Sequence, residues 1–126
     1  MKIKLLTLAT IAVIALNVSG ALAETCKSGS LQTGENGHVY CTSIGYQINW
    51  WSAYTWCEAQ GRHLASIYEV CPGWTGNDSS CNMGTFTSGS TFWTSTAEGT
   101  ETAFRISKSG AGRYNRNLAL AYAICY

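Results

Sequence analysis

The stretch that decides the fold is WWSAYTWCEAQGRHLASI, which occupies residues 50–67. Trp50, Ala53 and Cys57 follow one another at spacings of three and four, so they share one face of a helix. Gly61 supplies the left-handed conformation on which many helices end. We therefore expect a helix that begins at Trp50, ends just before Gly61 and packs this face against a sheet. A short buried strand is expected after the glycine, in the apolar stretch of Leu64, Ala65 and Ile67.

A short second helix is expected directly after this stretch. Ser66 and Glu69 have the spacing of a capping box, in which the two side chains satisfy backbone N–H groups at a helix start. Pro72 has to end this helix, because proline cannot donate the hydrogen bond that would continue it. Asn49 is the expected N-cap of the longer helix.

The rest of the pattern predicts strands. Residues 25–41 have the composition of a hairpin with a turn at Asn36 and Gly37. Residues 102–107 alternate between apolar and polar side chains, as in a half-buried strand. Further strands are expected at residues 92–95 and 119–126.

Alternation also predicts which side chains share a face. In residues 102–107, Phe104 and Ile106 fall on one face of the strand, and Arg105 and Ser107 fall on the other. The last strand carries small side chains on one face, suited to lying under a helix: Ala121, Ala123 and Cys125.

The N-terminus predicts export. Residues 1–23 combine a basic start, an apolar core and a small-residue end, which is the arrangement of a signal peptide. Residues 24–126 then form one domain with a net charge of −1. This balance gives no electrostatic footprint for nucleic acid, and no membrane span remains once the signal is removed. We expect a secreted, periplasmic or cell-surface protein.

The six cysteines all follow the predicted signal peptide. An even number of cysteines in an exported chain predicts three disulfides, although spacing alone leaves their pairing open. Zinc binding by thiolates is not expected, because the chain has no C-x-x-C pair and neither His38 nor His63 has finger-like spacing from two cysteines.

The pattern W-x-x-A-x-x-x-C-x-x-x-G-x-x-L-A-x-I resembles the opening helix of a C-type lectin-like domain, whose helix cysteine pairs with one near the C-terminus. The resemblance covers nearly all of residues 24–126. It implies an α+β fold with one main helix and a short second helix on a small, mostly antiparallel sheet. It also implies three disulfides: Cys57–Cys125, Cys26–Cys41 and Cys71–Cys81.

The chain departs from that family where calcium would bind. Calcium-dependent sugar binding there uses a Glu-Pro-Asn or Gln-Pro-Asp triplet and a Trp-Asn-Asp triplet, and neither occurs here. The only proline is Pro72. Calcium takes about six to eight oxygen ligands, so Asp78, Glu98 and Glu101 are too few and too scattered. We expect no metal and no cofactor.

Two segments carry the candidate binding residues. Trp74 lies in a polar loop, where an exposed ring would form a platform for a pyranose; alternatively, Trp74 anchors its own loop. Residues 112–117 resemble the variable surface of lectin-fold receptors diversified by bacterial retroelements, which implies exposed, ligand-facing side chains. The candidates are Trp74, Asn77, Asp78 and Asn82 in the loop, and Tyr114, Asn115 and Asn117 in the later segment.

These observations predict a non-catalytic recognition module that binds a glycan or a protein surface outside the cytoplasm. No G-x-S-x-G motif is present, and three disulfides would leave no thiol nucleophile. One alternative is a structural or adhesive cell-surface subunit, which an exposed apolar patch at Trp51, Tyr54 and Trp56 would favour. Another is a ligand-binding protein diversified by a retroelement. A concave polar surface around an exposed Trp74 would favour ligand binding.

Overall fold

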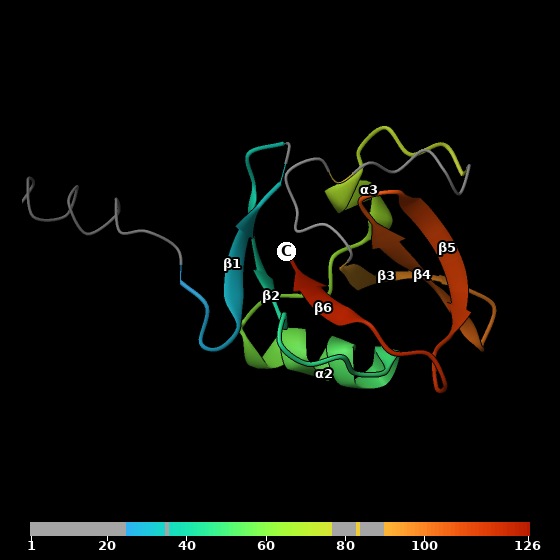
Figure 1. Ribbon diagram of the computed structural model, residues 1–126, viewed down its shortest axis with the longest axis horizontal. Helices are drawn as coiled ribbons and strands as arrows, with labels where there is room; N and C mark the ends of the chain where they lie inside the picture. Colours follow the sequence, from blue (N-terminus) through green and yellow to red (C-terminus); the bar gives the residue numbers. More distant parts are fainter. Residues whose placement is uncertain (1–24, 35, 77–82, 84–89) are drawn as a thin grey trace, which may run out of the picture.

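The computed structural model describes residues 25–34, 36–76, 83 and 90–126, and Figure 1 shows their arrangement. The predicted signal peptide therefore lies outside the described residues. The elements are β1 (Ser30–Thr33), β2 (Val39–Thr42), α2 (Trp50–Ala59), α3 (Ile67–Val70), β3 (Thr91–Glu98), β4 (Thr102–Ser107), β5 (Gly110–Asn115) and β6 (Tyr122–Cys125).

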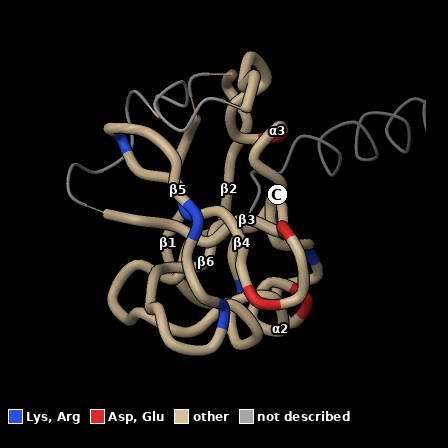
Figure 2. The backbone as a smooth tube through the Cα atoms, turned by 90° about the vertical axis from the view of Figure 1, so that its right-hand side faces the viewer, with Lys and Arg blue, Asp and Glu red and all other residues tan. Residues whose placement is uncertain are grey.

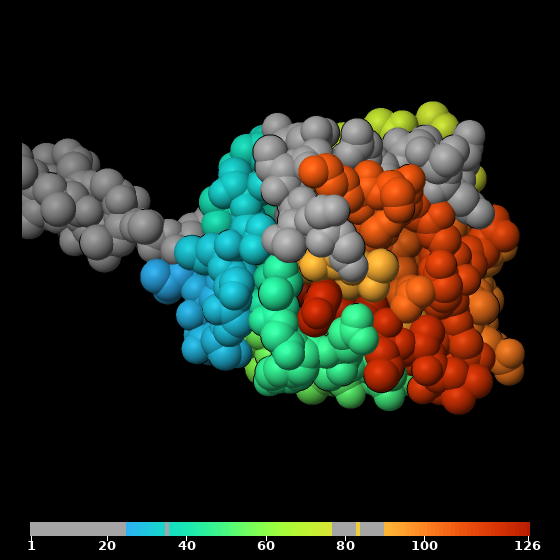
Figure 3. Space-filling view, in the orientation of Figure 1, coloured from blue at the N-terminus to red at the C-terminus, as the bar shows by residue number. Residues whose placement is uncertain are grey.

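The strands form one sheet in the order β1-β2-β6-β3-β4-β5. Every neighbouring pair is antiparallel except β3 and β6, which run parallel. The N-terminal hairpin and β5 lie at opposite ends of the molecule, as the blue-to-cyan and orange-to-red surfaces in Figure 3 show. The expected α+β class, with one main helix and one short helix on a mostly antiparallel sheet, is confirmed.

Local capping sets the limits of both helices. The Asn49 side chain accepts a hydrogen bond from the Ser52 N–H at 2.9 Å, as expected of an N-cap. Gly61 adopts a φ of +73°, so the helix ends where its sequence predicts. Ser66 and Glu69 form the predicted capping box at the start of α3.

The sheet buries an apolar cluster on each face. On one face, α2 packs Trp50, Ala53 and Cys57 against Trp93 and the small side chains of β6. The other face carries a second cluster, which includes Ile67 of α3 and Trp74. Figure 1 shows α3 on the side of the sheet opposite α2. The predicted alternation is confirmed, because Ala121, Ala123 and Cys125 pack in the first cluster, whereas Phe104 and Ile106 pack in the second.

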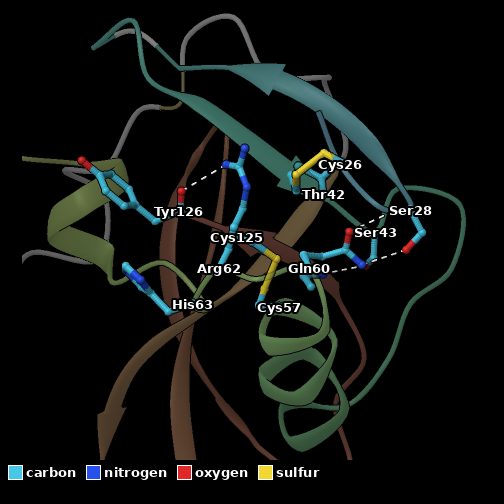
Figure 4. The surroundings of a disulfide bond; sticks show 12 residues. Cys26, Ser28, Thr42, Ser43, Cys57, Gln60, Arg62, His63, Cys125 and Tyr126 are labelled. Carbon is cyan, nitrogen blue, oxygen red and sulfur yellow. Dashed lines mark hydrogen bonds between the residues drawn. A yellow bond between two sulfur atoms is a disulfide. The ribbon is translucent and has the colours of Figure 1, made fainter. Parts of the chain in front are cut away.

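Two disulfides join described residues, both as predicted. Cys57–Cys125 links α2 to β6, and Cys26–Cys41 ties the N-terminal segment to β2. Figure 4 shows the two bonds close together, with Gln60 hydrogen-bonded to Ser28 beside them. Cys71 is also disulfide-bonded, and its predicted partner, Cys81, lies outside the described residues.

Three strand predictions need correction. The strand expected at residues 92–95 extends over Thr91–Glu98, because its outer half pairs with β4 beyond a register shift. The strand expected at 119–126 is confined to Tyr122–Cys125, because residues 116–120 turn across the start of α2 instead. Leu64, expected in a short strand, forms a single bridge with Cys125.

No helix in the described part of the chain has the length and apolar character needed to cross a membrane.

Candidate functional site

A polar pocket of about 310 Å³ lies over β4 and β5. Its size falls at the lower end of the range typical of small-molecule sites. The side chains that give it chemistry are one arginine, one tyrosine and three hydroxyls. The lining consists of Thr91, Arg105, Ile106, Ser107, Ser109, Gly110, Ala111, Gly112 and Tyr114.

Strand register explains why the pocket is hollow. Arg105 stands opposite Gly112, and Ser107 stands opposite Gly110, on adjacent antiparallel strands. Directly opposite residues point to the same face of a sheet, so two positions that would normally carry side chains are empty there. The next residue of β5 on this face is Tyr114, which closes the hollow at one end.

Arg105 and Tyr114 form the central contact of the pocket. The Arg105 guanidinium carbon lies 3.4 Å from the centroid of the Tyr114 ring, which is a close cation–π stack. Arg105 Nη1 also donates a hydrogen bond to the Leu120 carbonyl at 2.7 Å. The ring and the carbonyl together hold the guanidinium in one orientation.

Gly112 allows this stack to form. A Cβ atom placed on Gly112 would lie 2.9 Å from Tyr114 Cε2 and 3.3 Å from the phenol oxygen. Real side chains avoid such short contacts. The tyrosine ring therefore occupies the space that any larger residue at this position would need.

The hydroxyl groups of the pocket are arranged by the β4–β5 turn. The Oγ atoms of Ser107 and Ser109 lie 2.9 Å apart, and the Ser109 N–H donates to Ser107 Oγ at 3.3 Å. Thr91 lies opposite Ser107 on β3, so it adds a third hydroxyl on the same face. These groups are both donors and acceptors, as a polyhydroxylated ligand requires.

Among the described residues of the lining, Arg105 is the one cation and none is acidic. The other arginine of this hairpin, Arg113, lies on the opposite face of the sheet, where it is paired with Glu98. Charged residues are sparse elsewhere, and both signs occur (Figure 2).

Trp74 does not provide the predicted exposed platform. Only 8% of its surface is exposed, and its ring makes edge contacts with Phe104 and Tyr68 at centroid distances of 5.0 and 5.4 Å. The alternative expectation, that Trp74 anchors its loop, describes this position. The three polar candidates from the same loop lie outside the described residues: Asn77, Asp78 and Asn82.

The three candidate residues predicted in residues 112–117 lie in different surroundings. Tyr114 is 41% exposed and lines the pocket. Asn115 is half-buried, and its side-chain oxygen accepts hydrogen bonds from the Asn117 and Leu118 N–H groups, so it shapes a turn. Asn117 is exposed and accepts a hydrogen bond from Trp51 Nε1 at 2.8 Å, which places it near the start of α2.

A second surface lies on the outer side of α2. Trp51 and Tyr54 are 51% and 43% exposed, and Trp56 is half-buried. A shallow, mainly apolar hollow of about 430 Å³ lies beside them, lined by Trp51, Ser52, Thr55, Trp56 and Ala59. This is the kind of patch that the alternative structural role requires.

The described residues offer no metal cluster, since no three of their His, Cys, Asp or Glu side chains lie together. The described cysteines are all disulfide-bonded. Among the described residues that line the pocket there is no carboxylate, imidazole or thiol.

Sequence reasoning missed Arg105 as a site residue. The residue was placed correctly on the polar face of its strand, but a polar face alone indicates only solvent exposure. The signal that was missed is the pair Gly110 and Gly112 on β5, because glycines opposite polar residues leave a hollow.

No model of a known protein family matches this sequence, and a search of curated proteins also finds no match.

Proposed function

We propose that this chain is an exported, non-catalytic recognition domain of C-type lectin-like fold that binds a saccharide in the β4–β5 pocket without calcium. The observation that carries the proposal is the pocket itself, where the Arg105–Tyr114 stack meets the hydroxyls of Ser107, Ser109 and Thr91.

The chemistry of this lining suits a sugar. Saccharides present both apolar C–H faces and many hydroxyls, so their sites combine an aromatic ring with convergent polar groups. Tyr114 supplies the ring, and the serine and threonine hydroxyls supply donors and acceptors. The described residues of the lining include no acid, base or thiol, which favours binding over hydrolysis.

Two features support the family assignment within this proposal. Cys57 on the main helix is bonded to Cys125 on the last strand, which is the pairing that the resemblance implies. The capped helices and the strands follow the expected order along the chain. Disulfides are also compatible with an extracellular location.

A glycan array tests the proposal, using the oxidised mature chain with calcium or with a chelator. We expect binding that does not change with chelator and that falls about tenfold in Tyr114→Ala, because an aromatic contact is lost. Tyr46→Ala is the matched control, since Tyr46 is 62% exposed and lies outside the pocket lining. Failure to bind any glycan contradicts the proposal, and loss of binding with chelator contradicts calcium independence.

The outer face of α2 favours a second candidate, a structural or adhesive subunit whose exposed aromatics pack against a neighbouring molecule. Trp51 and Tyr54 leave an apolar surface that isolated monomers seldom keep without a purpose. Sedimentation velocity over a range of concentrations distinguishes the two. Self-association that disappears in Trp51→Ser/Tyr54→Ser supports the structural role, and a monomer at every concentration contradicts self-assembly.

A further inference from the structure

We infer that the saccharide bound by the β4–β5 pocket carries a carboxylate, as in a uronic or nonulosonic acid, and that Arg105 recognises this group. The inference rests on the proposed function, because it names the ligand class of the same pocket.

Arg105 carries a positive charge that no acidic side chain among the described residues neutralises. Its guanidinium has no carboxylate partner among the described residues, where the ion pairs are His63–Glu69 and Arg113–Glu98. Arg105 is also half-buried, so part of its hydration is lost. A partly desolvated cation without a counter-charge in a pocket wall is a favourable partner for an anionic ligand.

Arg105 also keeps hydrogen-bond donors that the described residues do not use. A guanidinium has five N–H groups. The Arg105 guanidinium uses Nη1 in its hydrogen bond to the Leu120 carbonyl. Its Nε has no hydrogen-bond partner among the described residues, but this atom is buried and out of reach of a ligand. Nη2 forms no hydrogen bond with the described residues either, so its two N–H groups remain for a group that arrives from outside.

The guanidinium of Arg105 is held in one orientation. The Tyr114 ring and the Leu120 carbonyl fix the plane of the guanidinium before any ligand binds. A fixed, planar arginine matches the geometry of a carboxylate and can form two parallel hydrogen bonds with it. Lysine would not reproduce this match, because its ammonium is a point charge on a flexible stem.

The other residues of the pocket lining favour an acidic saccharide over other carboxylates. Ser107 and Ser109 lie at one end of the pocket with their hydroxyls in contact, and Thr91 faces them from β3. A carboxylate at Arg105 would leave the rest of its molecule among these hydroxyls. Ring hydroxyls of a sugar complement them, whereas an apolar side chain would leave them unsatisfied.

The test uses matched ligands on the oxidised mature chain. The probes are immobilised oligosaccharides that end in a uronic or nonulosonic acid, each paired with its carboxyl-reduced derivative of the same length. We expect the acids to bind at least about tenfold more tightly than the reduced derivatives, because a charge-assisted bidentate contact is lost. This comparison involves no mutation, so it is independent of any folding defect.

Variants then assign the effect to Arg105. Arg105→Gln is expected to lose about thirtyfold in affinity for the acids and little for neutral sugars, and Arg105→Lys is expected to recover only part of the loss. Arg113→Gln is the matched control, because Arg113 lies on the opposite face of the same hairpin and should leave affinity unchanged. Near-ultraviolet circular dichroism verifies that each variant is folded.

The outcomes separate the inference from the proposed function. Equal binding of acids and reduced derivatives overturns the inference and leaves saccharide recognition in place. Acid binding that Arg105→Gln and Arg113→Gln weaken equally overturns the assignment to Arg105. Absence of binding to acidic and neutral glycans alike overturns both the inference and the proposed function.

Discussion

At the scale of single residues, the pocket depends on a position without a side chain as well as on the side chains that line it. Gly112 leaves room for the Tyr114 ring, and the ring in turn supports Arg105. Each of these three residues positions the next, so one methyl group added at Gly112 would displace the Tyr114 ring and with it the Arg105 guanidinium. Ligand binding should therefore be sensitive to substitutions that hardly change stability.

We predict that Gly112→Ala lowers ligand affinity about tenfold while the melting temperature stays within a few degrees, since the added methyl displaces a ring and not the backbone. Isothermal titration and thermal unfolding measure the two quantities. Gly73→Ala is the matched control, because a Cβ there meets no atom within 4 Å. Equal affinity in Gly112→Ala and the native chain would show that the ring position does not matter.

A second residue-scale prediction concerns Tyr40. Burial raises the pKa of Tyr40 above its ordinary value of 10.0, and a hydrogen bond from Asn36 partly offsets the effect. Above pH 10.0 the unfolded chain loses this proton while the folded chain retains it, so the free energy of unfolding should fall as pH rises.

Urea denaturation between pH 8 and about pH 11 tests this, with Tyr40→Phe and Tyr68→Phe compared with the native chain. Tyr40→Phe should show a shallower alkaline decline, and Tyr68→Phe, which removes an exposed phenol, should follow the native curve. Parallel declines in all three proteins would assign the alkaline effect to other groups.

At the scale of elements, α2 was predictable because its signals are local. Asn49 as cap, the spacing of Trp50, Ala53 and Cys57, and Gly61 as stop all lie within one short stretch. The pocket was not predictable in the same way, because it arises from the register between β4 and β5. Periodicity gives the face of each strand, but it does not say which residue of the next strand stands opposite.

The disulfide on α2 leads to a prediction at this scale. The chain-entropy model gives about 4 kcal/mol for Cys57–Cys125, which closes 68 residues, and about 3 kcal/mol for Cys26–Cys41, which closes 15. Removing the first bond as Cys57→Ala/Cys125→Ala should therefore destabilise the domain more than Cys26→Ala/Cys41→Ala. Guanidinium denaturation of the two double variants measures the difference, and the reverse order would contradict it.

At the scale of the whole molecule, β6 holds the two halves of the sheet together. It pairs with β2 on one side and with β3 on the other, and it carries the disulfide to α2. Sequence reasoning foresaw its small, helix-facing side chains. It did not specify the parallel pairing with β3, because this contact joins segments far apart in the chain and leaves no local signal.

Hydrogen exchange should reflect this arrangement. Amides of β6 and the paired part of β3 are expected to exchange only by global unfolding, because the strands are central and buried on both faces. Amides of β1 and β5 should exchange faster, since both are edge strands. Exchange followed by NMR measures the rates, and protection in β5 equal to that in β6 would contradict the prediction.

The register between β2 and β6 has a consequence for oxidative folding. Cys41 and Cys125 stand directly opposite each other, yet each is bonded elsewhere, to Cys26 and Cys57. Opposed residues of antiparallel strands have Cα atoms at about 4.5 to 5.5 Å, which is within reach of a disulfide. A chain that pairs these strands before α2 docks can therefore be trapped with a mispaired Cys41–Cys125 bond, and an isomerase in the compartment of maturation would speed its rescue.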